Sequence, residues 1–278
     1  MRIPGIYNLI PLMFLSVVNT AASDTRAVVE IEVTKGEDIK KSSQIITYGE
    51  NRVRIDFSGE QAKVTRETPY IMTVDGGKTW VLGDKPKDKF YCSKMQTEAF
   101  FRNVGDQVTR AMDFFNVTAT HPTVKKILEE PGPKIKGHET MHLQLETNAA
   151  AYAWIIFFKV DYTVRIVDDI WYAKDLDMHP IKRKWINALK QSGNSVIDNL
   201  IGDYTANLSG PVLKTETVIE IKNVKKKDVK IQKKRTKVTK IKELQADEIF
   251  AMPECIEMDD DEVKKKAKAL FSSGRIML

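Results

Sequence analysis

The five residues from His138 to His142 match the pattern H-E-x-x-H, which is typical of zinc-dependent hydrolases. On a helix, residues four apart lie about 6 Å apart along one face, so both imidazoles can bind one zinc ion while Glu139 activates a water molecule. On a strand, the two histidines share a face but stand about 13 Å apart, because each residue advances the chain by about 3.3 Å. One ion cannot bridge that distance. The chemistry of the motif therefore depends on the secondary structure of this segment.

The residues around the motif predict a strand. Apolar Met141, Leu143 and Leu145 alternate with polar positions at a period of two. Gly137 precedes the motif directly, and residues 131–133 (Pro-Gly-Pro) form a turn cluster just upstream, so a helix would lack its first turns. We therefore expect no metal and no catalytic residue here. A secreted zinc hydrolase that uses His138, Glu139 and His142, with a distant third ligand such as Asp168, is the alternative.

The first 22 residues are typical of a cleavable export signal. Arg2 is the only charged residue, the stretch from Leu9 to Val18 is mostly apolar, and small residues follow at Thr20-Ala21-Ala22-Ser23. We expect residues 23–278 to form a single domain in the periplasm or outside the cell. In such an oxidising compartment Cys92 and Cys255 could form one disulfide, although two separate buried thiols are equally compatible with the sequence.

Period-two alternation dominates the chain and predicts an antiparallel sheet with one apolar face. It runs through Val28 to Val33, Gln44 to Phe57, Tyr70 to Leu82 and Val160 to Val167, with turns between successive strands. Asp168 and Asp169 follow each other on one strand, so their side chains point to opposite faces and cannot form a paired-carboxylate acid/base site.

Three segments have helical spacing instead. Apolar residues recur every three or four positions from Phe100 to Phe115, from Ile181 to Leu189 and from Val196 to Ile201, with Gly193 as a break. A further helix at about 259–272 has acids first and lysines later, as the helix dipole favours. Such stripes usually pack on a sheet, and they could also form a movable lid over an apolar cavity.

The stretch from Lys222 to Lys242 contains eleven Lys or Arg residues and one acid, Asp228. It contains no aromatic residue, which argues against a nucleic-acid surface. We expect a Lys-rich β-hairpin at about 212–244 with a solvated face. Its basic side chains could dock on an anionic membrane surface or an acidic envelope protein. The residues expected to do so are Lys225, Lys226, Lys227, Lys233, Lys234 and Arg235.

Several stretches resemble a bacterial family. They are the export signal, Asn51-Arg52-Val53-Arg54-Ile55-Asp56-Phe57, Thr73-Val74-Asp75-Gly76-Gly77-Lys78-Thr79-Trp80-Val81-Leu82, Lys89-Phe90-Tyr91, Gly137-His138-Glu139-Thr140-Met141-His142-Leu143 and Asp169-Ile170-Trp171-Tyr172. They are similar to exported domains of the periplasmic lipoprotein-carrier type (LolA/LolB, outer-membrane lipoprotein sorting), in an uncharacterised branch. The resemblance implies an α+β fold, in which a strongly curved antiparallel half-barrel sheet has helices packed on its concave side around an apolar pocket.

The resulting hypothesis is a non-catalytic, monomeric carrier or sensor without a cofactor, which binds a lipid or lipoprotein acyl chain. Each buried CH₂ of such a chain contributes about 0.8 kcal/mol, so few polar contacts are needed. We expect apolar strand residues to line the pocket and one helical stripe to cover it. These residues are Val53, Ile55, Met72, Trp80, Val104, Val108 and Met112. An envelope interaction protein that docks through the basic hairpin is a further alternative.

Overall fold

The protein is represented by a computed structural model that describes residues 24–59, 70–84, 91–114, 117–155, 158–244, 247–252 and 254–272. The expected export signal at residues 1–22 lies outside these ranges. None of the described helices is both long and apolar enough to cross a membrane.

Thirteen strands in the described residues form one sheet, in the order β13-β6-β5-β4-β3-β2-β1-β12-β11-β10-β9-β7, with β8 paired to β9. All pairings are antiparallel except that of β13 with β6. The strands are β1 Asp24–Lys35, β2 Asp38–Gly49, β3 Arg52–Gly59, β4 Tyr70–Thr73, β5 Thr79–Asp84, β6 Tyr91–Gln96, β7 Val117–Ala119, β8 Thr123–Ile135, β9 His138–Ile155, β10 Phe158–Ala173, β11 Val212–Asn223, β12 Val229–Leu244 and β13 Cys255–Glu257.

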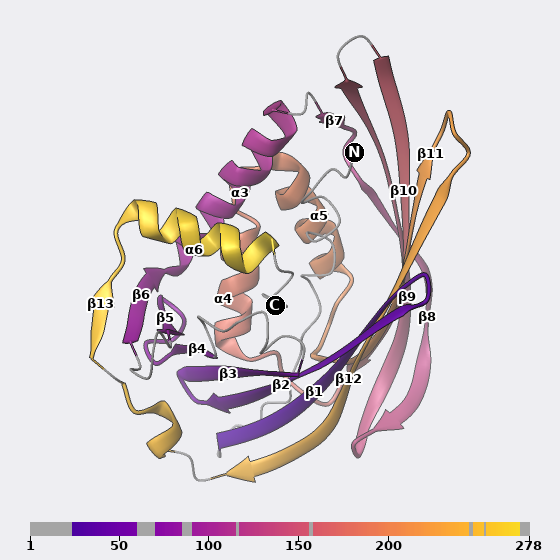
Figure 1. The fold of residues 1–278 in the computed structure, drawn as a ribbon. Helices are drawn as coiled ribbons and strands as arrows, with labels where there is room; N and C mark the ends of the chain where they lie inside the picture. The colour runs from indigo at the N-terminus through magenta and orange to yellow at the C-terminus, as the bar shows by residue number, and fades with distance from the viewer. Residues whose placement is uncertain are drawn as a thin grey trace.

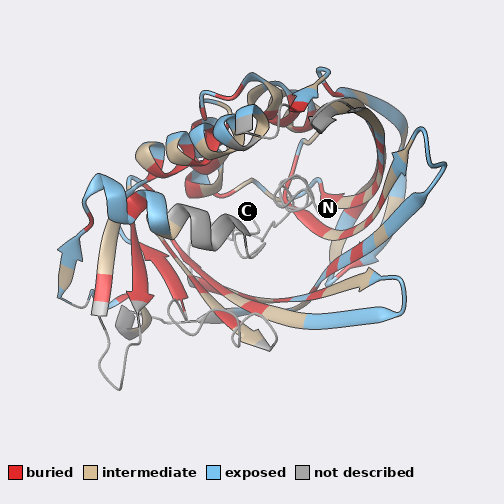
Figure 2. Ribbon diagram, turned by 45° about the horizontal axis from the view of Figure 1, so that its top comes forward, coloured by how far each residue is buried: buried red, intermediate tan, exposed pale blue. Residues whose placement is uncertain are grey.

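The sheet curves strongly, and helices lie inside the curve (Figure 1). They are α3 Thr97–Phe114, α4 Pro180–Leu189 and α5 Ser195–Ala206, while α6 Asp260–Ser272 lies against α3 and a short 3₁₀ helix, η2, spans Asp247–Phe250. Buried residues follow the inner face of the sheet and the facing sides of these helices, and the hairpin ends are exposed (Figure 2). The predicted architecture, a curved antiparallel sheet with helices on one side, is confirmed at this level.

The helices begin where the sequence supplies N-terminal caps. Asn194 Oδ1 accepts hydrogen bonds from the backbone N–H groups of Val196 and Ile197, each at 3.1 Å, and so caps α5. Pro180 occupies the first turn of α4, where its missing N–H costs nothing. Between the two helices Gly193 has φ +83°, a conformation that glycine adopts easily. The predicted helix break at Gly193 is therefore confirmed.

The turn predicted at residues 131–133 is wrong. These residues belong to β8, where Pro131 lies opposite Met141 and the register shifts between Gly132 and Ile135. Among the described strands β8 pairs with β9 alone, so it is an edge strand, where proline is tolerated. The chain reverses instead at Lys136 and Gly137, which have φ +53° and +89°.

The two cysteines join the last strand to the sheet. β13 pairs with β6 so that Cys255 lies opposite Cys92, and the two side chains form a disulfide with the Cα atoms 4.8 Å apart. The bond connects residues 163 apart in sequence. It fixes the segment that leads into α6, whose Val263 is buried in the main core.

Candidate functional site

The H-E-x-x-H segment forms the start of β9, as its alternation predicts. His138 Nδ1 lies 3.1 Å from Asp175 Oδ2, and His142 Nε2 lies 2.9 Å from Asp169 Oδ1. Asp168, considered above as a distant zinc ligand, faces the other side of the sheet. Within the described residues no group of three or more His, Cys, Asp or Glu side chains could hold a metal ion. The helical geometry that a zinc hydrolase requires is thus absent from this segment.

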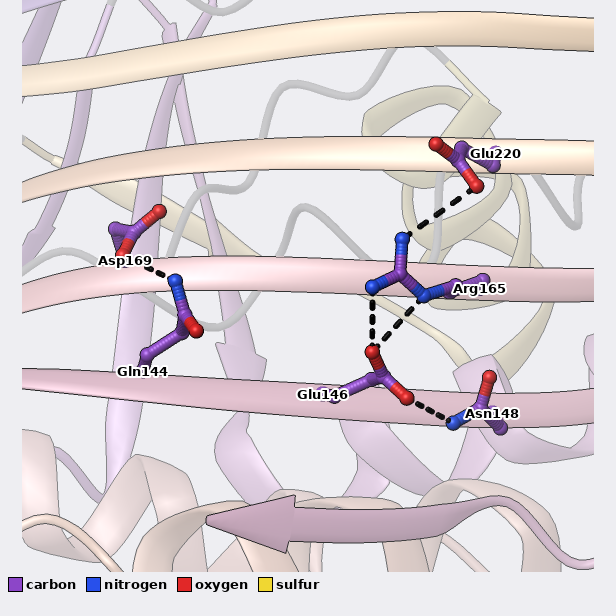
Figure 3. A network of polar contacts seen from close by, with 6 residues as sticks. All are labelled: Gln144, Glu146, Asn148, Arg165, Asp169 and Glu220. Atoms are coloured by element: carbon purple, nitrogen blue, oxygen red, sulfur yellow. Dashed lines mark hydrogen bonds and ion pairs between the residues drawn. The ribbon is translucent and has the colours of Figure 1, made fainter. Parts of the chain in front are cut away.

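The outer face of this part of the sheet is a solvated polar surface. Gln144 donates a hydrogen bond to Asp169, and Arg165 connects Glu146 on β9 to Glu220 on β11 (Figure 3). The His142 ring stacks on Trp171 at a centroid distance of 4.6 Å, and Lys214 Nζ lies 3.9 Å from the centre of the Trp171 ring. The polar side chains named here have hydrogen-bond or ion-pair partners on the same face. We therefore place the candidate site on the inner face.

Most of the apolar residues predicted to line a pocket lie together on the inner face. Val53, Ile55, Trp80 and Val104 are buried in one cluster, and Val108 is partly buried against it. Met112, further along α3, is half-buried. The predicted stripe on α3 therefore faces the sheet at Val104 and Val108.

Met72 does not belong to this group. It lies opposite Arg54 rather than opposite Val53 or Ile55, so its side chain points to the other face of the sheet. There it packs with Tyr70 and Phe250 of η2 in a separate buried cluster. The prediction that Met72 lines the inner face is wrong, because residues of β4 are buried on both faces and alternation alone does not distinguish them.

An aromatic junction forms the centre of the inner-face cluster. Trp80 of β5 and Trp185 of α4 lie with ring centroids 3.8 Å apart and planes at 55°. Phe101 of α3 meets the edge of Trp185 at 6.5 Å. Strand β5 and helices α3 and α4 therefore converge on two indole rings. The helical spacing of Ile181, Trp185 and Leu189 indicated burial of Trp185, but only the fold shows that its partner is Trp80.

The indole nitrogens of this junction are unusual. Trp80 and Trp185 are 4% and 7% exposed, and within the described part of the chain neither Nε1 atom has a hydrogen-bond acceptor. A buried donor without a partner costs about 1–3 kcal/mol, so native structures contain few of them. Two such donors therefore lie in one apolar cluster.

A second polar feature of the inner face was not predicted from the sequence. Asp168 is 2% exposed; one carboxylate oxygen accepts a hydrogen bond from Thr217 Oγ1 at 2.5 Å, and the other accepts one from the Tyr204 hydroxyl of α5. Thr147 Oγ1 lies 3.4 Å from the same hydroxyl. The group joins β9, β10 and β11 to the helix above them, so it fixes α5 on the sheet.

Lys234 belongs to this buried group and not to the basic surface. It lies opposite Thr217, which lies opposite Asp168, and it is only 4% exposed. The prediction that Lys234 docks a partner is therefore wrong. Its neighbours Lys233 and Arg235 point outward and are exposed, as are Lys225, Lys226 and Lys227 in the turn of the hairpin.

Burial changes the acid–base properties of this pair. Burial raises the pKa of Asp168 to about 7, while the Thr217 hydrogen bond and the charge of Lys234 oppose the rise. Burial lowers the pKa of Lys234 to about 7, opposed by the charge of Asp168. Both shifts have the same cause, because a charged form loses hydration inside the protein.

The inner face continues beyond Asp168 as an apolar strip. Val164 and Ile166 of β10 lie opposite Ile221 and Ile219 of β11, on the same face as Asp168 and Thr217. These four residues form a cluster of their own, to which no described helix contributes a side chain.

Comparisons with known proteins leave the family of this chain open. No family model matches it, and no curated protein does. The solved structures that it resembles include PNGF-II (TM-score 0.36, 12% identity, 88% of this chain covered) and a DUF1329 family protein from Desulfovibrio piger (0.25, 7%, 83%). They also include a domain from Vibrio parahaemolyticus described as a putative outer membrane lipoprotein-sorting protein domain (0.22, 8%, 89%). The chain spans 34% of PNGF-II, and 91% and 92% of the other two. Likenesses with such low scores carry no functional conclusion.

Proposed function

We propose that the protein binds an acyl chain of a lipid or lipoprotein on the inner face of its curved sheet, without catalysis. The site lies where β3 and β5 meet α3 and α4. The observation that supports it best is the pair of buried indole donors, Trp80 Nε1 and Trp185 Nε1, which have no acceptor within the described chain.

An acyl ester or amide suits this site because it combines a carbonyl oxygen with a long apolar chain. The carbonyl would accept a hydrogen bond from an indole N–H group and remove the cost of leaving that donor buried and unpaired. The chain would lie along Val53, Ile55 and Val104, where each buried CH₂ contributes about 0.8 kcal/mol. Binding requires the α3–α4 pair to move away from the sheet, so these helices act as the lid.

The compartment we propose is the periplasm or the exterior of the cell, where the protein serves as a carrier or sensor. The disulfide between Cys92 and Cys255 supports this proposal, because disulfides persist mainly in oxidising compartments. The apolar stretch before Ser23 supports it independently.

Isothermal titration calorimetry tests the site, because its signal does not depend on the tryptophans that are replaced. The delipidated, oxidised protein is titrated with a fatty-acid methyl ester, and affinity is compared with that for an alkane of equal length. Trp80→Phe and Trp185→Phe keep an aromatic ring but remove one donor each. We expect the affinity for the ester to fall about five- to tenfold for at least one of them, as for the loss of a hydrogen bond of about 1 kcal/mol. The affinity for the alkane should hardly change.

Trp171→Phe is the matched control, because Trp171 lies on the outer face and stacks on His142. It should bind the ester as the wild type does. Equal affinity for the ester in the wild type and the Trp80→Phe, Trp185→Phe double variant would contradict a role for the indole donors. Failure of the wild type to bind either probe would contradict the proposal as a whole.

A further inference from the structure

We propose that the projecting end of the β11–β12 hairpin, residues 222–233, docks the protein on an anionic phospholipid bilayer. This inference concerns a surface remote from the acyl site and does not depend on the cargo. β1 pairs with β12 only as far as Gln232, opposite Lys35, so the hairpin extends beyond the neighbouring β1–β2 hairpin. Figure 1 shows this end standing clear of the helices.

Apolar side chains are exposed on the hairpin end. Val224, Val229 and Ile231 are 45%, 47% and 49% exposed, although such residues are usually buried. Val229 lies opposite Lys222 and Ile231 opposite Glu220, so both point to the outer face of the sheet. Exposed valine and isoleucine side chains at a strand end provide apolar surface that can contact a membrane or a partner protein.

Positive charge surrounds these side chains. On β10, on β11 and in the turn of the hairpin, the acids near them are Asp228, Asp161, which lies 3.1 Å from Lys159 Nζ, and Glu220, which lies 3.6 Å from Arg165. Two of the three acids thus have a cation of their own. The exposed lysines of the hairpin end outnumber the remaining acid, and they are Lys222, Lys225, Lys226, Lys227, Lys230 and Lys233.

Hydrogen bonds hold the hairpin end in place. The Val224 N–H donates to the Asp161 carbonyl at 3.0 Å, and Lys225 Nζ donates to the Lys159 carbonyl at 2.8 Å. Within the turn, the backbone N–H of Lys226 donates to Asn223 Oδ1 at 3.0 Å. Residues 159–161 of β10 therefore lie beside the hairpin end. The lysines and the apolar side chains are presented together on a fixed backbone.

A bilayer fits this surface better than an acidic protein does. Anionic headgroups attract lysines at the membrane surface, and the acyl boundary below them accepts aliphatic side chains. An acidic peptide would satisfy the lysines but would place its carboxylates against Val229 and Ile231. The combination of aliphatic and cationic side chains therefore indicates a binding partner that presents anionic groups above an apolar layer.

Vesicle flotation tests the proposal with the full, oxidised chain. The vesicles contain equimolar phosphatidylglycerol and phosphatidylcholine, or phosphatidylcholine alone. We expect binding to the anionic vesicles, and we expect it to weaken as salt rises from about 0.1 M to about 1 M, because the screening length falls from about 10 Å to about 3 Å. The K225E, K226E, K227E triple variant should lose at least about a hundredfold in affinity.

Two matched controls test whether the effect is specific to the hairpin end, or whether any loss of positive charge or of exposed apolar side chains would produce it. Reversal of Lys264, Lys265 and Lys266 on α6 changes the net charge equally and should weaken binding far less. Val229→Ser with Ile231→Ser should weaken binding about five- to tenfold, whereas serine at the exposed Ile127 and Ile256 should leave it unchanged.

Equal binding of the hairpin and α6 charge variants to anionic vesicles would overturn the proposal. So would binding that ignores salt and lipid charge, or capture by an immobilised acidic peptide with no binding to anionic vesicles. The Trp80→Phe, Trp185→Phe double variant should dock normally. Loss of acyl binding and loss of docking can therefore be told apart.

Discussion

Replacing Thr217 by valine removes one hydroxyl from the buried group around Asp168 and changes the shape of the side chain little. Thr217 Oγ1 donates to Asp168 Oδ1 at 2.5 Å, and both residues are buried. A hydrogen bond to a charged group contributes about 1.5–3 kcal/mol, and one between neutral groups about 0.5–1.5 kcal/mol. The loss of stability should therefore depend on whether Asp168 is ionised.

The pH dependence follows from the pKa of Asp168, which is about 7 in the folded protein. The Thr217 hydrogen bond lowers that pKa by favouring the carboxylate, so the valine variant should raise it. At about pH 9 the carboxylate is charged and the variant should lose about 2 kcal/mol. At about pH 5 the acid is neutral in the fold and the loss should be about 1 kcal/mol smaller.

Chemical denaturation at the two pH values measures this difference, with the disulfide kept oxidised. Thr215→Val is the matched control, because Thr215 is buried on the same strand and bonds Thr236 Oγ1 at 2.6 Å rather than a titrating group. Its deficit should be the same at both pH values. A Thr217→Val deficit that does not change with pH, or that is larger at about pH 5, would refute the reasoning about Asp168.

Three further predictions concern charge, covalent structure and packing. Because burial raises the pKa of Asp168 to about 7, its contribution to stability is complete below the unfolded pKa of about 4 and is lost as pH rises to about 7. Between those values the unfolding free energy of the wild type, measured by urea titration, should fall by up to about 4 kcal/mol relative to that of Asp168→Asn. Plots of unfolding free energy against pH that run parallel for the two proteins would contradict this. Cys92→Ser with Cys255→Ser should lower stability by about 2–5 kcal/mol, and a thermal midpoint equal to that of the oxidised wild type would argue against the bond. Gly105→Ala would place a Cβ atom against the Ser192 carbonyl oxygen, so it should cost about 1–3 kcal/mol in a denaturant titration. Gly202→Ala on α5 has open space and should raise stability by up to about 1 kcal/mol, because alanine is the better helix former.

Local sequence patterns were sufficient to predict most elements of this fold. Alternation at a period of two identified the strand character of the H-E-x-x-H segment, and Gly137 with φ +89° marks the turn before it. The helical stripes and the break at Gly193 depend on equally local rules. Local patterns also showed that Asp168 and Asp169 face opposite sides of the sheet.

The errors about burial arise where contacts between distant segments decide which side chains are covered. Met72 is covered by Phe250, far along the chain, so both faces of β4 are buried and its alternation is uninformative. Lys234 stands between two exposed basic residues, and its position in that run suggested a solvated side chain. Its period-two relation to Thr236 and Val238, both buried, was the available signal that Lys234 faces inward. The pairing of Trp80 with Trp185 required the tertiary fold.

The central claim is that the inner face of the sheet binds an acyl chain, and extraction of bound lipid tests it most directly. The protein is purified from its native host without detergent, extracted with organic solvent and examined by mass spectrometry. We predict an acyl lipid or acylated peptide in the wild type, and less of it in the Trp80→Phe, Trp185→Phe double variant than in Trp171→Phe. Repeated extraction without any acyl species, from a folded protein that also fails to bind added acyl probes, would contradict the claim.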